Sequence, residues 1–170
     1  SKAIMRWNLP SLELSQNYLF FYDQLEKANL YLQGVIDTRK QSFDDRMVDW
    51  LFQNPLSDGG TFCGVADLSE KYGLVPMEVM PETYSAENTS RMARLVSSKL
   101  REYGLELRKM VAQKASAQRL RQRKTEMLGT IYKMLAMTIG EPVKSFEYAF
   151  KDKNGKAIGR PRTYTPKEFY

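Results

Sequence analysis

The chain has 170 residues, of which 42% are hydrophobic, and its formal net charge is +6 at pH 7. That length supports one core of ordinary size and a second small lobe. The single cysteine, Cys63, excludes an internal disulfide framework and favours a reducing compartment, so we expect a cytoplasmic location. No apolar run approaches the roughly 18 residues of a membrane-spanning helix, so no membrane segment is expected.

Histidine is absent from the sequence, and this absence bears on nucleophilic chemistry. A thiol nucleophile normally needs an imidazole to form the thiolate and to protonate the leaving amine. With no histidine and one thiol, the chain also lacks clustered metal ligands. We therefore expect no catalytic residue, no metal and no cofactor within this chain.

Helical periodicity dominates the first half of the sequence. The expected helices cover residues 15–34, residues 62–72, and a segment that starts near Ser42 or Asp44 and ends before Asn54-Pro55. Proline pushes the residue before it out of helical space, which ends the second of these helices. Gly73 is typical of a helix C-terminus, and residues 76–81 are expected to be extended.

The second half contains two long helices and then a change of period. Apolar residues follow helical spacing over 92–111 and again over 128–139. From Phe146 to Phe150 the apolar period drops to two, and the turn-forming residues 152–155 follow. This pattern predicts a β-hairpin whose return strand lies at 156–158.

Both ends of the chain suggest that it is a piece of a longer protein. Ser1 stands where a complete protein would have an initiator methionine. Thr165-Pro166-Lys167-Glu168 has the pattern of a capping box with proline at the first helical position. The chain stops two residues later, so we expect a truncated helix there.

Five cations crowd into eleven residues between the two long apolar faces. They are Lys114, Arg119, Arg121, Arg123 and Lys124. One interpretation is a helix edge that faces phosphates; the others are a solvated helix or a subunit contact. We expect these cations to face solvent or an interface, because burying them unpaired is prohibitively costly.

Two adjacent glycines, Gly59 and Gly60, precede the expected helix 62–72. A phosphate-binding loop is excluded, because no strand precedes them and no Gly-Lys-Ser/Thr sequence follows. Two residues without Cβ atoms allow a foreign backbone to approach, so an extended peptide can pair with this segment. A tight turn that needs positive φ explains the same glycines equally well.

Seven short motifs occur in order along the chain. They are LSQNYLFF (14–21), DDR (44–46), NPLSDGG (54–60), EKYGLVP (70–76), PETY (81–84), KLREY (99–103) and TPKEFY (165–170). Together they resemble the bleomycin hydrolase / aminopeptidase C family of papain-like cysteine peptidases. In that family the catalytic cysteine and oxyanion-hole glutamine precede the first motif, and the catalytic histidine and asparagine lie far downstream. The resemblance implies an internal part of a cysteine aminopeptidase, inactive by itself.

The resemblance also implies a fold: mainly α, the helical left-lobe part of a papain-like α+β fold, with a long helical insertion and a short β-hairpin near the C-terminus. The implied divisions are 1–84 for the left-lobe helices, 85–142 for the insertion, and 143–170 for the hairpin and the truncated helix.

The implied substrate-binding residues lie around the two glycines. Asp58, Gly59 and Gly60 match the segment that hydrogen-bonds the substrate backbone in papain-like enzymes. Phe62 stands where relatives commonly have tryptophan, beside a side-chain pocket. Cys63 does not match the family's nucleophile.

The family further implies peptide substrates and a hexamer that encloses a channel. Some members bind nucleic acid through lysines that face this channel, so weak nucleic-acid binding by residues 114–124 is a further expectation. The alternative function is a stand-alone helical module that binds nucleic acid or protein through the same residues.

Overall fold

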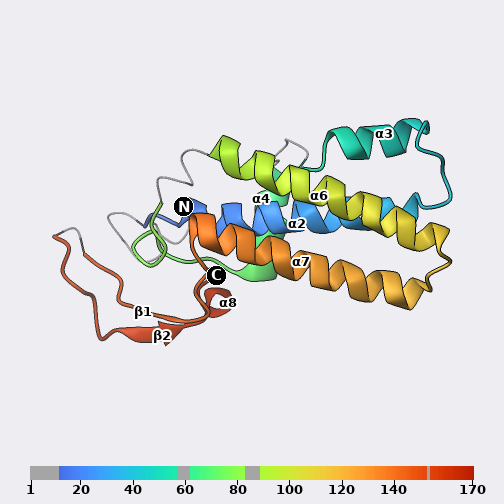
Figure 1. The fold of residues 1–170 in the computed structure, drawn as a ribbon. Helices are drawn as coiled ribbons and strands as arrows, with labels where there is room; N and C mark the ends of the chain where they lie inside the picture. The colour runs from blue at the N-terminus through green and yellow to red at the C-terminus, as the bar shows by residue number, and fades with distance from the viewer. Residues whose placement is uncertain (1–11, 57–61, 83–88, 153) are drawn as a thin grey trace. The chain divides into compact units, whose positions relative to one another are not determined.

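The computed structural model describes residues 12–56, 62–82, 89–152 and 154–170, and for Phe62 and Cys63 it describes the backbone alone. Most of these residues are helical (Figure 1). The elements are α2 (Gln16–Asp37), α3 (Arg46–Gln53), α4 (Phe62–Tyr72), α6 (Thr89–Ala112), α7 (Ala117–Ile139), β1 (Phe146–Tyr148), β2 (Arg162–Tyr164) and α8 (Pro166–Phe169). The expected fold, mainly α with a short antiparallel pair of strands near the C-terminus, is confirmed.

The chain falls into two compact units. The first unit contains residues 1–20, 61–82 and 142–170, and the second contains residues 21–60 and 83–141. Each unit therefore combines segments that are distant in sequence, and contacts between those segments decide its structure.

Helix α2 begins where the sequence predicts and continues past its expected end. The Ser15 hydroxyl accepts a hydrogen bond from the Tyr18 backbone N–H at 3.0 Å, which makes Ser15 the N-terminal cap. The helix does not stop at Gly34. A Cβ there would lie 3.1 Å from Cδ2 of Leu51, so this glycine serves close packing against α3. Leu30 of this helix is 67% exposed, although it is apolar.

The shorter helices start and end with clear local signals. Asp45 caps α3 by accepting hydrogen bonds from the backbone N–H groups of Met47 (2.9 Å) and Val48 (3.4 Å). Helix α4 ends before Gly73, whose φ is +82°, as the sequence predicts. The expectation of an extended segment at 76–81 is wrong. A backbone hydrogen bond from the Val79 N–H to the Pro76 oxygen closes a turn at 3.0 Å.

Helices α2, α6 and α7 form the core of the second unit. A four-residue loop joins α6 to α7, and Ser116 caps α7 by accepting a hydrogen bond from the Arg119 N–H. Phe21 of α2 packs edge-to-face on Tyr132 of α7, with 5.0 Å between ring centroids. The buried apolar side chains of α6 and α7 are Met92, Val96, Leu100, Tyr103, Leu107, Leu120, Met127, Ile131, Leu135 and Ile139.

The strand pairing near the C-terminus differs from the expectation. Strand β1 pairs with β2, in the register Phe146↔Tyr164, rather than with 156–158. Residues 156–158 do face 150–152, through the isolated bridge Lys151↔Ala157 and a hydrogen bond from the Ile158 N–H to the Phe150 oxygen at 2.6 Å, but they are not part of a strand. Gly159 follows with φ +83°, a left-handed conformation that interrupts the ladder, so regular pairing resumes at β2.

Substituting alanine at two glycines inside helices should change the free energy of unfolding in opposite directions. A Cβ on Gly104 of α6 would collide with the buried Tyr31 hydroxyl and lie 2.9 Å from Cζ of Phe52, whereas Gly129 of α7 has open space. We expect Gly104→Ala to lower the free energy of unfolding by about 2 kcal/mol through overpacking. The control, Gly129→Ala, should raise it by about 0.5 kcal/mol through helix propensity. Urea unfolding measures both, and equal changes would contradict this packing.

Candidate functional site

The substrate-binding residues expected from the sequence stand immediately before α4. Asp58, Gly59 and Gly60 lie outside the described residues, and Phe62 opens α4 with a side chain that is also outside the description. The structure does describe contacts that hold the end of α4.

The last carbonyl groups of α4 receive hydrogen bonds from outside the helix. The Tyr18 hydroxyl donates to the Tyr72 carbonyl oxygen at 2.8 Å. The Lys167 ammonium group donates to the Glu70 carbonyl oxygen. Because the last four carbonyls of an α-helix have no intrahelical donor, these two side chains satisfy groups that otherwise need water.

Helix α8 touches the end of α4 through its backbone. The Leu74 N–H donates to the Pro166 carbonyl oxygen at 2.9 Å, and a Cβ on Gly73 would fall on the Pro166 backbone. A capping box fixes α8 itself: Glu168 accepts from the Thr165 N–H at 2.7 Å, and the Thr165 hydroxyl accepts from the Glu168 N–H. The backbone hydrogen bond holds the pKa of the Glu168 carboxyl below its ordinary value.

The segment that follows α4 pairs with the start of the described chain. An antiparallel bridge joins Leu14 to Pro76, and the Ser15 N–H donates to the Val75 oxygen at 2.9 Å. The buried Ser15 hydroxyl also donates to the Met80 oxygen at 2.5 Å. Main-chain hydrogen bonds and one buried polar contact therefore hold residues 14–15 against residues 75–80.

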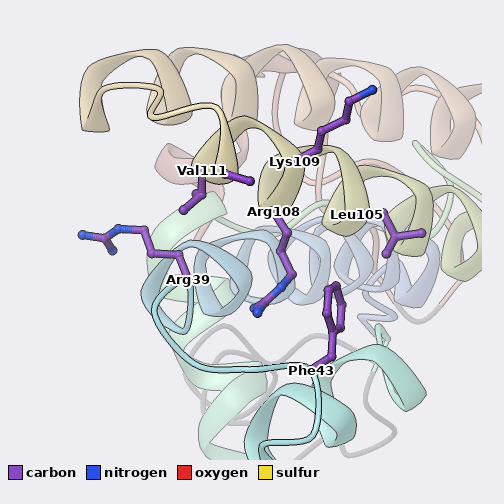
Figure 2. Close-up of a pocket in the computed structure, with 7 residues that line it drawn as sticks. Arg39, Phe43, Leu105, Arg108, Lys109 and Val111 are labelled. Carbon is purple, nitrogen blue, oxygen red and sulfur yellow. The ribbon is translucent and has the colours of Figure 1, made fainter.

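A hollow of about 450 Å³ lies in the second unit between the end of α2, the loop after it and α6 (Figure 2). Its lining residues are Arg39, Phe43, Leu105, Arg108, Lys109, Val111 and Ala112. Figure 2 shows Arg108 reaching toward the loop, while Arg39 and Lys109 extend away from Phe43. None of these lining side chains carries a carboxylate, thiol or hydroxyl group.

Arg108 has a structural role at this hollow, because it contacts the loop after α2. Its guanidinium donates to the carbonyl oxygens of Thr38 (3.4 Å) and Gln41 and lies 4.3 Å from the Phe43 ring centroid. These contacts tie the loop after α2 to α6. The sequence analysis missed this role, because nothing in the local sequence distinguishes Arg108 from the other cations of α6.

The five cations of residues 114–124 divide into an exposed group and a paired, half-buried group. Lys114, Arg119 and Arg121 are exposed. Arg123 pairs with Glu106 at 2.7 Å and with Glu126 at 2.8 Å. Lys124 donates to the Gln33 side-chain oxygen at 2.8 Å, and burial lowers the pKa of its ammonium group. The expectation that these cations face solvent is confirmed for Lys114, Arg119 and Arg121, whereas Arg123 and Lys124 are half-buried beside these partners.

The described ranges contain neither a candidate metal site nor a candidate membrane-spanning helix. Within them, no three histidine, cysteine or acidic side chains gather in a position to hold a metal ion. Every helix there is too short or too polar to cross a bilayer.

The Glu106–Arg123 pair predicts a pH dependence of stability. The hydrogen bond from Arg123 holds the pKa of Glu106 below its ordinary value of about 4.3, so the pair stabilises the fold above that pH. This contribution is lost as the pH falls through the depressed pKa. Glu106 is 37% exposed, so Glu106→Gln should lower the free energy of unfolding by only about 0.5 kcal/mol at pH 7. Urea unfolding at pH 7 and pH 2 should show the difference disappearing at pH 2; an equal loss at both would contradict it.

Comparison with known proteins gives one consistent family. The whole chain, residues 1–170, matches the Peptidase C1-like family. Aminopeptidase C of Listeria monocytogenes is 40% identical over 162 residues, which are 95% of this chain and 36% of the relative. Bleomycin hydrolase of Homo sapiens is 36% identical over 167 residues, with 96% of this chain and 36% of the relative covered.

A solved structure agrees with these relatives. The crystal structure of PepW from Lactobacillus rhamnosis HN001 matches with a TM-score of 0.88 and 37% identity, over 98% of this chain and 37% of that one. The chain thus spans about a third of the length of the relatives it matches. Since the family match extends from the first residue to the last, the chain belongs to the Peptidase C1-like family.

Proposed function

We propose that this chain is an internal part of a cysteine aminopeptidase and supplies its substrate-flanking helical portion. One observation carries the proposal: the family match covers all 170 residues, yet the sequence contains no histidine. A thiolate–imidazole mechanism needs that side chain, so the catalytic cysteine and histidine belong to portions of the parent enzyme outside this chain. The 36% share of the curated relatives supports this division.

The proposed role of Asp58, Gly59 and Gly60 is to hold an extended peptide by main-chain hydrogen bonds. Phe62 would lie beside a neighbouring side-chain pocket. Such a segment takes no part in proton transfer. It aligns the scissile bond with the nucleophile, and alignment is a large part of the rate enhancement in enzymes. The substrates of the parent enzyme would be peptides cleaved at their N-terminal residue.

Further features of the parent enzyme follow from the family resemblance. These are a hexameric assembly, a cytoplasmic location and a division of this chain at residues 84 and 142. Weak nucleic-acid binding by 114–124 would fall to its exposed members Lys114, Arg119 and Arg121. No observation favours the alternative of a stand-alone binding module, and we do not propose it.

We expect the 170-residue chain alone to have no peptidase activity, because it lacks the imidazole that activates the thiol. Hydrolysis of aminoacyl fluorogenic substrates by the purified chain is the measurement, with Cys63→Ala as the control. Turnover by the chain that disappears in Cys63→Ala would overturn the assignment of the catalytic residues to other portions.

In the complete parent enzyme, we expect Gly60→Val to lower kcat/KM by about a hundredfold, because a side chain there displaces the bound peptide by about 1 Å. Its melting temperature should change little. If the glycine instead serves only a tight turn, the variant loses stability and each folded molecule keeps normal turnover. Measuring kcat/KM and Tm on the same preparation separates these results.

A further inference from the structure

The hollow of the second unit joins positive charge to exposed apolar surface. Three of its lining side chains are cations, Arg39, Arg108 and Lys109, and none is a carboxylate. Phe43 and Leu105 line it as well, and these side chains are 52% and 54% exposed. All five residues belong to the second unit, so the hollow lies within one compact part of the chain.

Two of the three cations are available to a ligand. Arg108 is held by carbonyl groups of the loop after α2. Arg39 and Lys109 are exposed, and within the described part of the chain neither forms an ion pair. Arg39 donates from Nη1 to the Ile36 carbonyl oxygen at 2.8 Å, which leaves its other N–H groups for a further acceptor. Figure 2 shows both side chains extending outward, on different sides of Arg108.

The acidic residues nearest in sequence to this loop do not neutralise the hollow. Asp37 accepts a hydrogen bond from the Gln33 side chain at 2.8 Å, and Asp45 caps α3. Asp44 follows Phe43 in sequence but is not a lining residue. The charge on the lining is therefore positive, and a carboxylate partner for these cations has to come from another molecule.

Helix geometry explains the cations but not the apolar side chains between them. Helix α2 ends at Asp37 and α6 at Ala112, and cations near a helix C-terminus complement the helix dipole. That effect requires no apolar neighbour. An exposed phenylalanine and an exposed leucine beside unpaired cations instead have the composition of a binding surface, in which apolar contact supplies affinity and charge selects the partner.

The exposure of the apolar walls favours a peptide over a small metabolite. The volume of about 450 Å³ lies in the range of small-ligand sites. Such sites bury most of the ligand surface, however, and here Phe43 and Leu105 are about half exposed. An apolar side chain of a peptide can lie between these walls while the neighbouring carboxylates of the peptide reach the cations at the rim.

We propose that this hollow binds an acidic peptide segment: an apolar side chain of the peptide packs against Phe43 and Leu105, and carboxylates on either side of it pair with Arg39 and Lys109. Arg108 takes no direct part and holds the loop that carries Phe43. The inference goes beyond the proposed function and is independent of it, because it uses no catalytic or substrate-flanking residue.

The test is a titration of the 170-residue chain with short peptides labelled with fluorescein, followed by fluorescence anisotropy. The probe alternates glutamate with leucine, and two control peptides replace either glutamate by glutamine or leucine by serine. The label blocks the N-terminal amine, so that no peptide is a substrate for an aminopeptidase. We expect the glutamate–leucine peptide to bind, more weakly as salt is added, and both control peptides to bind about tenfold more weakly.

Variants of the chain locate the binding at the hollow. Arg39→Gln and Lys109→Gln should each weaken binding about threefold, and the double variant about tenfold. Leu105→Ser should weaken it about fivefold by removing apolar contact. Lys133→Gln is the matched control, because Lys133 is an exposed lysine of the same unit outside the lining, and it should leave binding unchanged. All these side chains are exposed, so the variants are expected to fold, which circular dichroism checks.

Several results would refute the proposal. They are an absence of binding, equal binding of the glutamine peptide, and an equal effect of Lys133→Gln and Lys109→Gln. Displacement of the peptide by octanoate at similar concentration would assign the hollow to small carboxylates in place of peptides. A dimer in sedimentation experiments that Leu105→Ser dissociates would assign it to a second copy of the chain. Either assignment would overturn the peptide as the ligand.

Discussion

The first unit depends on one constraint: the carbonyl groups at the end of α4 must find donors. A helix leaves its last carbonyls without internal partners, and this chain provides a hydroxyl from α2 and an ammonium group from α8. Because Tyr18 and Lys167 come from opposite ends of the chain, satisfying these carbonyls also brings three distant segments together. The absence of Cβ on Gly73 then allows α8 to approach to backbone contact.

The second unit follows a different constraint, the close approach of helices at glycines. Gly34 admits the Leu51 side chain, and Gly104 admits the Tyr31 hydroxyl and the Phe52 ring. This packing leaves the Tyr31 hydroxyl buried, with no hydrogen-bond partner among the described residues, and burial raises its pKa. An unsatisfied buried hydroxyl costs stability, so the apolar core around it has to offset that loss.

Sequence reasoning succeeded where the controlling interaction is local. The Thr165 capping box acts within four residues and was predicted from its pattern, and the helix that Ser15 caps was predicted to start at that residue. It failed where the reason is tertiary: Gly34 resembles a helix terminator, but its neighbour Leu51 lies on another helix. The return strand was misplaced because the left-handed conformation of Gly159 cannot be inferred from strand periodicity. The anchors of α4 lie 54 and 97 residues from their acceptors, which no local pattern reveals.

The candidate site is predicted from its motif and could not have been predicted from its chemistry. A segment that binds a peptide backbone contributes N–H and C=O groups, which every residue has, and needs small side chains rather than reactive ones. A search for titratable clusters therefore passes over Gly59 and Gly60. What distinguishes such a segment physically is the rigidity of its support, since an error of about 1 Å in alignment costs about as much rate as the loss of a general acid or base.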